Sequence, residues 1–463
     1  MEYTTNDVVN ATTELARANN YPLIRVTSGP LQGKLHLNAI PPGPARERLA
    51  VDLPWSVANA STIGGVGGGG GWDFFSALCW FSLRDTMDAN AAAGVVDLPL
   101  GGVVECYGGT SIQYWSSADA IAACPLAATN PGTACCGYGG NNSCLFDAQV
   151  APYTVGPTRF AAVLWMQGAS RRNARSAVAC APPAAPLTHN NSEPGTPPRH
   201  HRAGEQNANC GGPAQIAYYS CALPALIADW RAKFGSPSLP FGVFLLAAWK
   251  ATDPAFPLLR LLQVGAAAAI PNVFTASTLD AGEPNGGPVH SPFKQLPASR
   301  AARALQALLY GRAVGAWRGP RAASARADSL TAPVEFGADA AGAPLALDWS
   351  GATCPPAVGA ASCESFAVLT SDCAWRSVES AGGGGAALAA SLPSPTALAL
   401  TLQGGGVAGL AIVAVRGYFA NWPLVALRNA AGLPAEPWLL NVSAHNCSSW
   451  PRAEAWVDSG VHA

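Results

Sequence analysis

The stretch that decides the fold is Val163-Leu164-Trp165-Met166-Gln167-Gly168. A short apolar run that stops at an amide and a glycine predicts a buried central strand, which delivers polar groups at its carboxyl end. Residues 102–110 and 272–276 share this design. Because sites in open α/β sheets form at the carboxyl ends of the strands, we expect these three strand ends to meet in one crevice.

The composition limits the partners that the protein attracts. Only 12% of the 463 residues are charged, and the formal net charge is −1. This balance gives no field that would steer nucleic acid or an anionic membrane, so we expect a neutral or weakly charged ligand. The longest apolar runs, 239–249 and 407–415, reach about half of the roughly 20 residues that a membrane span needs. We therefore expect no transmembrane helix.

Cysteines and sequons favour passage through the secretory pathway. The chain holds 13 cysteines, and Asn-x-Ser/Thr sequons begin at Asn10, Asn59, Asn141, Asn190, Asn441 and Asn446. The cysteine spacings match no zinc pattern, so we expect no metal site, and the odd count leaves at least one thiol unpaired. Against secretion, residues 1–7 have neither the basic region nor the apolar core of a signal peptide.

Strands that alternate with helices over residues 1–327 predict an α/β domain with a doubly wound, mainly parallel sheet. We expect helices capped by Asn6 or Asp7 and by Asp73, and two more over 216–234 and 298–312. The helix over 216–234 should break near Pro224, because proline removes a hydrogen-bond donor. Residues 54–56 should lie in a loop.

Several segments differ from this regular pattern. We expect low-complexity inserts at about 62–71 and 170–212, and a disulfide-stapled excursion over 118–150. The second insert contains His189, His200 and His201. Because the tract is rich in proline, we expect these histidines to be solvated and not to bind a metal. From about residue 328 the apolar residues alternate in short runs, which predicts a β-rich accessory domain over 328–445 and a loose tail over 446–463.

The predicted strand ends carry groups suited to ester hydrolysis. Gly108 and Gly109 offer backbone N–H groups that could face an oxyanion, and Gln167 offers an amide donor. His290 lies in a loop between a strand and a helix of the core. Each has an ordinary alternative, namely a plain turn, a satisfied core amide and a solvated histidine. Together they are the equipment of an esterase that lacks its nucleophile. The chain has no Gly-x-Ser-x-Gly elbow, and Cys106 fits a buried apolar cysteine better than a nucleophile.

Two blocks resemble a known family. Residues 107–115 are similar to the Gly-Gly-Thr-x-Ile-Glu-x-Trp block of the sialate O-acetylesterases, a branch of the SGNH (GDSL-like) hydrolases. Residues 164–168 are similar to their Trp-Tyr-Gln-Gly-Glu-Ser block. Supporting matches lie at 51–56, 75–81, 220–230, 240–242 and 418–423, so the resemblance runs from residue 1 to about residue 442.

The resemblance implies an SGNH-type fold, no cofactor, and an O-acetylated sugar or glycan as substrate. It makes Gly109 and Gln167 the oxyanion donors and His290 the general base. The chain departs from the family pattern at Ala169, Gln113 and Ser291, where the family has Glu, Glu and Pro. Residues 287 and 288 are not acidic, so Asp280 or Glu283 is the candidate for the acid that orients the histidine.

The nucleophile is expected ahead of the printed chain. Met1 aligns with the Met of the family's Gly-Gln-Ser-Asn-Met block, and this alignment places the attacking serine two residues upstream of Met1. The alternative is true loss of the serine, which would leave a non-catalytic SGNH homologue that binds glycans. A purely structural glycoprotein would fit the sequons and cysteines but leaves the converging strand ends unexplained.

Overall fold

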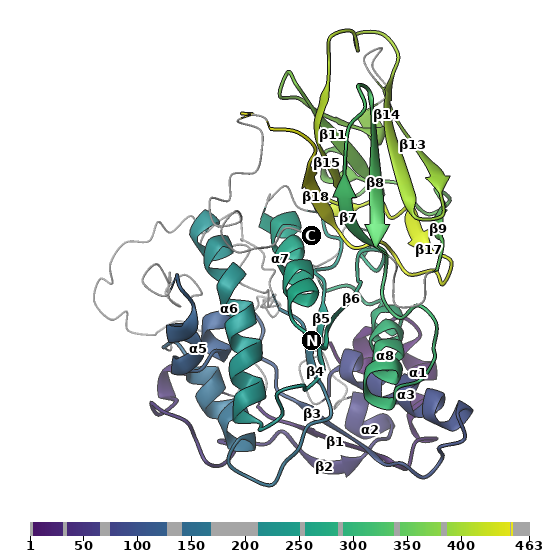
Figure 1. Ribbon diagram of the computed structural model, residues 1–463. Helices are drawn as coiled ribbons and strands as arrows, with labels where there is room; N and C mark the ends of the chain where they lie inside the picture. The colour runs from purple at the N-terminus through teal and green to yellow at the C-terminus, as the bar shows by residue number, and fades with distance from the viewer. Residues whose placement is uncertain are drawn as a thin grey trace, which may run out of the picture.

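The computed structural model describes most of the chain (Figure 1). The described residues are 3–30, 35–64, 75–126, 141–167, 212–250, 255–285, 290–337, 343–380, 387–444 and 446–447. Three features predicted from sequence lie outside them: most of the first low-complexity insert, nearly all of the second with its three histidines, and the tail after residue 447.

Three strands from the first part of the chain form one sheet in the order β2-β1-β3. Strand β1 (Ile24–Ser28) pairs in parallel with β3 (Leu100–Val104), whereas β2 (Leu53–Val57) pairs antiparallel with β1 at the edge. The prediction of a loop over 54–56 was therefore wrong. Pro54 is tolerated because β2 is an edge strand whose pairing shifts register between Val26 and Ser28.

Two of the three predicted strands are β4 (Val163–Trp165) and β6 (Val273–Ala276), and each pairs in parallel with β5 (Phe241–Phe244). The third predicted strand is β3, which belongs to the first sheet and not to this one. Phe241, Gly242, Val243 and Phe244 are all buried, as expected for a strand covered on both faces. Among the described residues, β3 pairs only with β1, and no strand of the β2-β1-β3 sheet pairs with β4. The α/β class is confirmed, but the strands form two three-stranded sheets instead of one.

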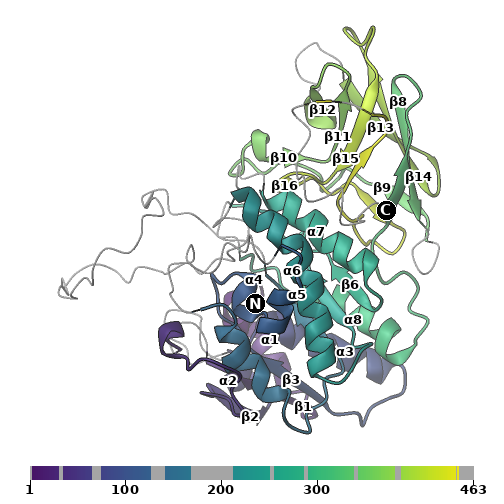
Figure 2. The same ribbon diagram turned by 60° about the vertical axis from the view of Figure 1, so that its left-hand side comes forward.

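Helices cover both faces of these strands (Figures 1 and 2). Phe241 and Val243 share an apolar core with α6 (Gly212–Lys233) and α7 (Ala255–Ala269). Phe244 and Phe274 share a second core with the helices of the opposite face. Those helices are α1 (Ala11–Ala18), α3 (Ala77–Ala92) and α8 (Gln295–Tyr310). Alternate residues of β5 thus point to opposite helical layers, which is the period of a strand.

The ends of three helices differ from the predictions. Thr4, and not Asn6 or Asp7, caps the short helix η1 (Thr5–Asp7), and α1 follows Asn10, whose φ is 61°. Ser76 caps α3, and Asp73 lies outside the described residues. Helix α6 continues through Pro224 without a break. Leu223, Leu226 and Ile227 are fully buried beside this proline, and their packing offsets the missing hydrogen bond.

Short elements join the two helical layers to the strands. Cys124 follows α5 and forms a disulfide with Cys221 of α6, so the described part of the 118–150 excursion is stapled as expected. The short elements are η2 (Leu37–Ala39), α2 (Ala60–Gly64), α4 (Ile112–Trp115), α5 (Ala118–Ala123), η5 (Phe146–Val150) and η6 (Ala151–Tyr153).

From Arg321 onward the described chain consists of strands and two short 3-10 helices, and this β-rich region lies at one end of the α/β part (Figures 1 and 2). One antiparallel sheet has the order β13-β14-β8-β7 and the other has the order β12-β11-β15-β18. Val334, Leu398, Leu400, Phe366 and Val415 fill the space between them.

The bounds in the first of these sheets are β7 (Arg321–Ala325), β8 (Thr331–Gly337), β13 (Ala387–Ser394) and β14 (Ala397–Gln403). Those in the second are β11 (Phe366–Thr370), β12 (Trp375–Ser377), β15 (Ile412–Gly417) and β18 (Trp438–Asn441). Two further pairs are β9 (Leu345–Leu347) with β17 (Leu427–Asn429), and β10 (Cys363–Glu364) with β16 (Trp422–Pro423). The 3-10 helices are η7 (Ala360–Ser362) and η8 (Val378–Ser380).

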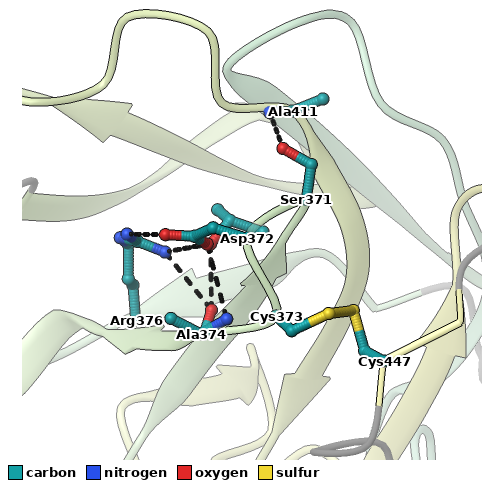
Figure 3. The surroundings of a disulfide bond; sticks show 8 residues. Ser371, Asp372, Cys373, Ala374, Arg376, Ala411 and Cys447 are labelled. Carbon is teal, nitrogen blue, oxygen red and sulfur yellow. Dashed lines mark hydrogen bonds and ion pairs between the residues drawn. A yellow bond between two sulfur atoms is a disulfide. The ribbon is translucent and has the colours of Figure 1, made fainter.

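Two disulfides stabilise the β-rich region. Cys354 pairs with Cys363, and Cys373 pairs with Cys447 (Figure 3). Figure 3 shows that the second disulfide joins the turn between β11 and β12 to the start of the predicted tail. The expectation of a loose segment from residue 446 is therefore corrected at Cys447, which is buried and covalently tied.

Candidate active site

The glycine turn after β3 has the backbone shape that its sequence predicts. Gly109 has a φ of 73°, in the left-handed region that favours glycine. The hydroxyl of Thr110 donates to the carbonyl of Tyr107 across 2.7 Å and accepts from the indole nitrogen of Trp115 at 3.0 Å. These two bonds fix the turn between β3 and α4.

Gln167 lies against this turn. Its side-chain Nε2 donates to the backbone carbonyl of Thr110 at 3.3 Å, and only 4% of the residue is exposed. On the other side, Nε2 of Gln263 in α7 donates to the backbone carbonyl of Gln167 at 3.1 Å. The structure therefore brings together two of the three groups that the sequence singled out, Gln167 and the turn at Gly109.

His290 is held against the beginning of the described chain. It is 8% exposed, and its ring centroid lies 5.7 Å from that of Tyr3. The backbone N–H of Val9 donates to the carbonyl of Pro292 at 3.2 Å, and Lys294 Nζ lies 5.4 Å from the centre of the Tyr3 ring. The segment after residue 3 thus packs on the loop that carries His290.

A small recess connects the loop of His290 with the strand ends. Met166, the residue before Gln167, lines it together with Ala247 and Thr278, which follow β5 and β6. Phe293 and Lys294 from the segment after His290 complete one wall of this recess. The carboxyl ends of β4, β5 and β6 therefore meet beside the His290 loop. That His290 shares one substrate with Gly109 and Gln167 remains a prediction.

The two candidate acids make other contacts. Both oxygens of Asp280 are bound by Arg300, at 2.6 and 2.8 Å, and Arg428 binds Oδ2 at 2.8 Å. Burial would raise the pKa of Asp280, but the hydrogen bonds and charges of the two arginines outweigh it and hold the pKa below its usual value. Glu283 accepts a hydrogen bond from the backbone N–H of Asn285 at 3.1 Å, within an exposed turn.

Cys106 lies in an apolar environment. It is 5% exposed and belongs to the core that contains Phe75, Phe81 and Val104. Burial raises the pKa of the nearby Cys79 thiol to about 12. Such surroundings disfavour a thiolate, which agrees with the interpretation of Cys106 as a structural cysteine.

Glu105 is a buried carboxylate that the sequence analysis did not single out. Tyr153 donates to its Oε1 at 2.7 Å, and Arg48 Nη2 lies 3.2 Å from the same atom. Oε2 is buried without a hydrogen-bond partner among the described residues. Burial raises the pKa of Glu105 to about 7 in spite of Arg48 and Tyr153. The available signal was an acidic residue directly after an apolar strand, four positions before Gly109.

The described part of the chain offers neither a clustered set of metal ligands nor a membrane-spanning helix. It contains no group of three or more His, Cys, Asp or Glu side chains arranged to hold a metal ion. Within the same residues, no helix combines the length and apolar character that crossing a membrane requires.

Comparison with known proteins supports the resemblance inferred from the two sequence blocks. The chain is 26% identical over 340 residues to the sialate O-acetylesterase of Homo sapiens, a match that covers 69% of this chain and 53% of that protein. It is 28% identical over 356 residues to the sialate O-acetylesterase of Rattus norvegicus, covering 69% of this chain and 56% of that protein. The resemblance to the sialate O-acetylesterases is confirmed. The chain spans about half the length of these curated relatives, and no protein-family model matches it.

A solved structure supports the fold. A carbohydrate acetylesterase from Xanthomonas citri has a TM-score of 0.66 to this chain at 20% identity, and the match covers 95% of this chain and 78% of that one. At this identity the likeness shows that the two proteins share a fold, and it shows nothing about the reaction. Because the match covers nearly the whole chain, it extends beyond the α/β part to the β-rich region.

Proposed function

We propose that the protein is a carbohydrate esterase of the sialate O-acetylesterase type, which hydrolyses O-acetyl esters on sialic acid or a related sugar. Relatives named as sialate O-acetylesterases, and a fold neighbour named as a carbohydrate acetylesterase, support an esterase of this kind. The proposed substrate is an O-acetylated sugar or glycan, and the proposed reaction is serine-type acyl transfer without a cofactor.

The observation that carries the proposal is the hydrogen bond from Gln167 Nε2 to the carbonyl of Thr110. It holds the Gln167 amide next to the backbone N–H groups of the Gly109 turn. In the proposed reaction, Gly109 and Gln167 bind the oxyanion that forms when the ester carbonyl is attacked, and His290 accepts the proton of the attacking hydroxyl.

The attacking hydroxyl is proposed to come from a serine in a Gly-Gln-Ser-Asn block joined ahead of Met1. The printed 463 residues contain no such block. Tyr3 packs on His290, so a segment joined to the chain there would approach the proposed base. Strands β3 and β4 each have one edge without a described partner, which offers a further parallel strand a place between the two sheets. Such a strand would deliver its last residues at the edge where the other strand ends meet.

We also propose that the protein matures in the secretory pathway. Three disulfides among the described residues, Cys124–Cys221, Cys354–Cys363 and Cys373–Cys447, support this proposal because disulfides persist in oxidising compartments. The sequon residues Asn10, Asn141, Asn441 and Asn446 are exposed and therefore accessible to glycosylation. Peptide mass analysis of the protein secreted from animal cells would test both points.

Three proteins test the esterase proposal. The first is the printed chain, the second carries an added apolar strand that ends in Gly-Gln-Ser-Asn before Met1, and the third has Ala in place of the added Ser. Acetyl release is measured from a chromogenic acetate and from 9-O-acetylated sialic acid. We expect release from the second protein only, at least about 10³-fold faster than from the others. Equal rates in all three would overturn the proposal.

One alternative is supported by a specific observation. The printed residues contain no Gly-Gln-Ser-Asn block, and the alternative is a non-catalytic homologue that binds glycans through the same crevice. Under this alternative, the strand-extended protein stays inactive while the printed chain binds acetylated glycans on an array. Reading the genomic sequence upstream of Met1 separates the two: an in-frame Gly-Gln-Ser-Asn favours the esterase, and a stop codon favours the binding protein.

A further inference from the structure

The loop that carries His290 lies between β6 and α8, and the structure describes its residues 277–285 and 290–294. Residues 278–282 pack closely against neighbouring elements. Leu279 is buried, and the hydroxyl of Thr278 donates to the carbonyl of Leu245. A Cβ added at Gly282 would lie 2.7 Å from the carbonyl oxygen of Ala248 and 2.7 Å from Trp422 of the β-rich region. The loop is therefore held between the end of β5 and that region.

Arg300 closes this loop from the side of α8. Its Nη1 donates to the carbonyl of Ser277 at 2.7 Å and to Asp280 Oδ1 at 2.6 Å, and its Nη2 donates to Asp280 Oδ2 at 2.8 Å. The side chains of Arg300 and Asp280 are 7% and 13% exposed. A two-pronged contact of this kind fixes orientation as well as distance. The beginning of the loop is thereby tied to the helix that follows His290.

Arg428 holds the same carboxylate from the β-rich region. It lies in β17, and its Nη1 donates to Asp280 Oδ2 at 2.8 Å and to the carbonyl of Gly432 at 3.1 Å. Two guanidinium groups thus share one carboxylate, although Arg428 and Asp280 are 148 positions apart in sequence. Asp280 is the point where α8, the histidine loop and the β-rich region meet.

We propose that Arg428 is a positioning residue, which acts through Asp280 to fix the loop that holds His290 at the strand ends. The effect of Arg428 on the reaction rests on the proposed esterase function, whereas its effect on the position of His290 does not. It gives the β-rich region a part in the reaction through the loop that carries His290. It also gives Asp280 a role distinct from orienting the imidazole directly.

Loss of Arg428 leaves Arg300 on Asp280, so residues 277–285 should stay folded while Asp280 loses one of its two arginine partners. Loss of Asp280 would leave two guanidinium groups without their shared partner and is a less selective test. The informative variants are therefore Arg428→Gln and Arg428→Lys. Lysine can restore the charge and one hydrogen bond, which makes it the conservative variant.

The chain offers a matched control in the same region. Arg416 of β15 pairs with Glu364 at 2.6 Å, and the two side chains are 14% and 13% exposed. Both partners belong to the β-rich region, so Arg416→Gln removes a similar ion pair that does not include Asp280. Thermal unfolding of every variant records the loss of stability that any broken ion pair would cause.

The test follows the imidazole of His290 by NMR in the printed chain labelled on histidine. The variant His290→Gln assigns its signal among the seven histidines. We expect Arg428→Gln to shift or broaden the His290 signal, Arg428→Lys to restore most of it, and Arg416→Gln to leave it unchanged. An unchanged His290 signal in Arg428→Gln, or an equal change in Arg416→Gln, would overturn the inference.

A second measurement applies to the strand-extended protein. Misplacement of a catalytic group by about 1 Å can cost up to about 10²-fold in rate, so we expect Arg428→Gln to lower kcat at least about tenfold with KM within about twofold. An unchanged kcat would contradict the inference. If the extended protein is inactive even without a substitution, the proposed function fails, while the NMR experiment still decides whether Arg428 positions the loop.

Discussion

The side-chain amide of Gln167 donates to the backbone carbonyl of Thr110 across 3.3 Å. This contact joins the end of β4 to the turn after β3, although the two residues are 57 positions apart in sequence. The buried side-chain amide of Gln263 donates a hydrogen bond to the backbone carbonyl of Gln167. The placement of Gln167 therefore depends on packing between the sheet and α7, and it does not require a bound substrate.

Replacing Gln167 should test the oxyanion role in the strand-extended protein. Gln167→Glu keeps the shape but removes both N–H donors and adds a negative charge where the oxyanion would form. We expect kcat for acetyl release to fall by about 10²- to 10³-fold. The control is Gln306→Glu, which alters a buried amide that bonds to Asn90 and Thr86. A comparable fall in both variants would show that only folding is affected.

Replacing His290 should test the proposed base. We expect His290→Gln to lower kcat by about 10²- to 10⁴-fold, because proton transfer from the attacking hydroxyl is lost while the substrate pocket stays intact. The exposed His36 provides the control, and His36→Gln should retain at least half of the activity. Steady-state kinetics with a chromogenic acetate measure both variants. Full activity in His290→Gln would remove this residue from the reaction.

Glu105 should make stability depend on pH. Burial raises its pKa from 4.5 to about 7, so the folded state binds the proton more tightly than the unfolded state does. Its contribution to stability is full below about pH 4.5 and is lost as the pH rises through about 7. A shift of this size corresponds to about 3 kcal/mol of unfolding free energy.

The variant Glu105→Gln should remove that part of the pH dependence. Urea unfolding at pH 5 and pH 8 measures it, and the loss of stability between the two values should be smaller in the variant than in the parent protein. Glu335→Gln, on the half-buried face of β8, is the control and should keep the parental dependence. If the parent and Glu105→Gln show the same dependence, the carboxyl group is ionised over this range in the folded protein.

Arg260 should hold the β-rich region on the α/β part. It is fully buried in α7 and donates to four carbonyl groups, those of Leu246, Ala247, Ala420 and Asn421. Arg260→Met leaves these acceptors buried without their donor, and we expect a loss of about 3 kcal/mol or more. The control Arg376→Ala breaks the more exposed ion pair with Asp372 seen in Figure 3 and should cost about 1 kcal/mol or less. Equal losses in urea unfolding would show that Arg260 is not a major contact.

The parts of the fold that sequence predicts best are those with strong local patterns. Strands β4 and β6 were predicted because each is a short, unbroken apolar run in the sequence. The switch to alternating apolar residues located the β-rich region, although its first strand begins at Arg321, ahead of residue 328. Gly109 and Gln167 were also predicted from a local pattern, because each stands at the end of an apolar run. In the structure Gly109 has a left-handed backbone and Gln167 is buried.

The features that sequence did not predict depend on distant partners. Pro54 and Pro224 suggested a loop and a helix break, but an edge position and surrounding core packing accommodate them. The ion pair between Asp280 and Arg428 links residues that no local pattern connects. Likewise, the pKa of Glu105 is set by burial against Arg48 and Tyr153 from other parts of the chain. Division of the strands into two sheets is also a property of long-range pairing.

The most direct test of the account is a search for an acetyl-enzyme in the strand-extended protein. The protein is mixed with a chromogenic acetate, quenched within its first turnover, digested and analysed by mass spectrometry. We predict an acetyl group on the added serine, and much less of it in His290→Gln and in Gln167→Glu. Acetate release without acetylation of that serine, or equal acetylation in all three proteins, would contradict an esterase site built from Gly109, Gln167 and His290.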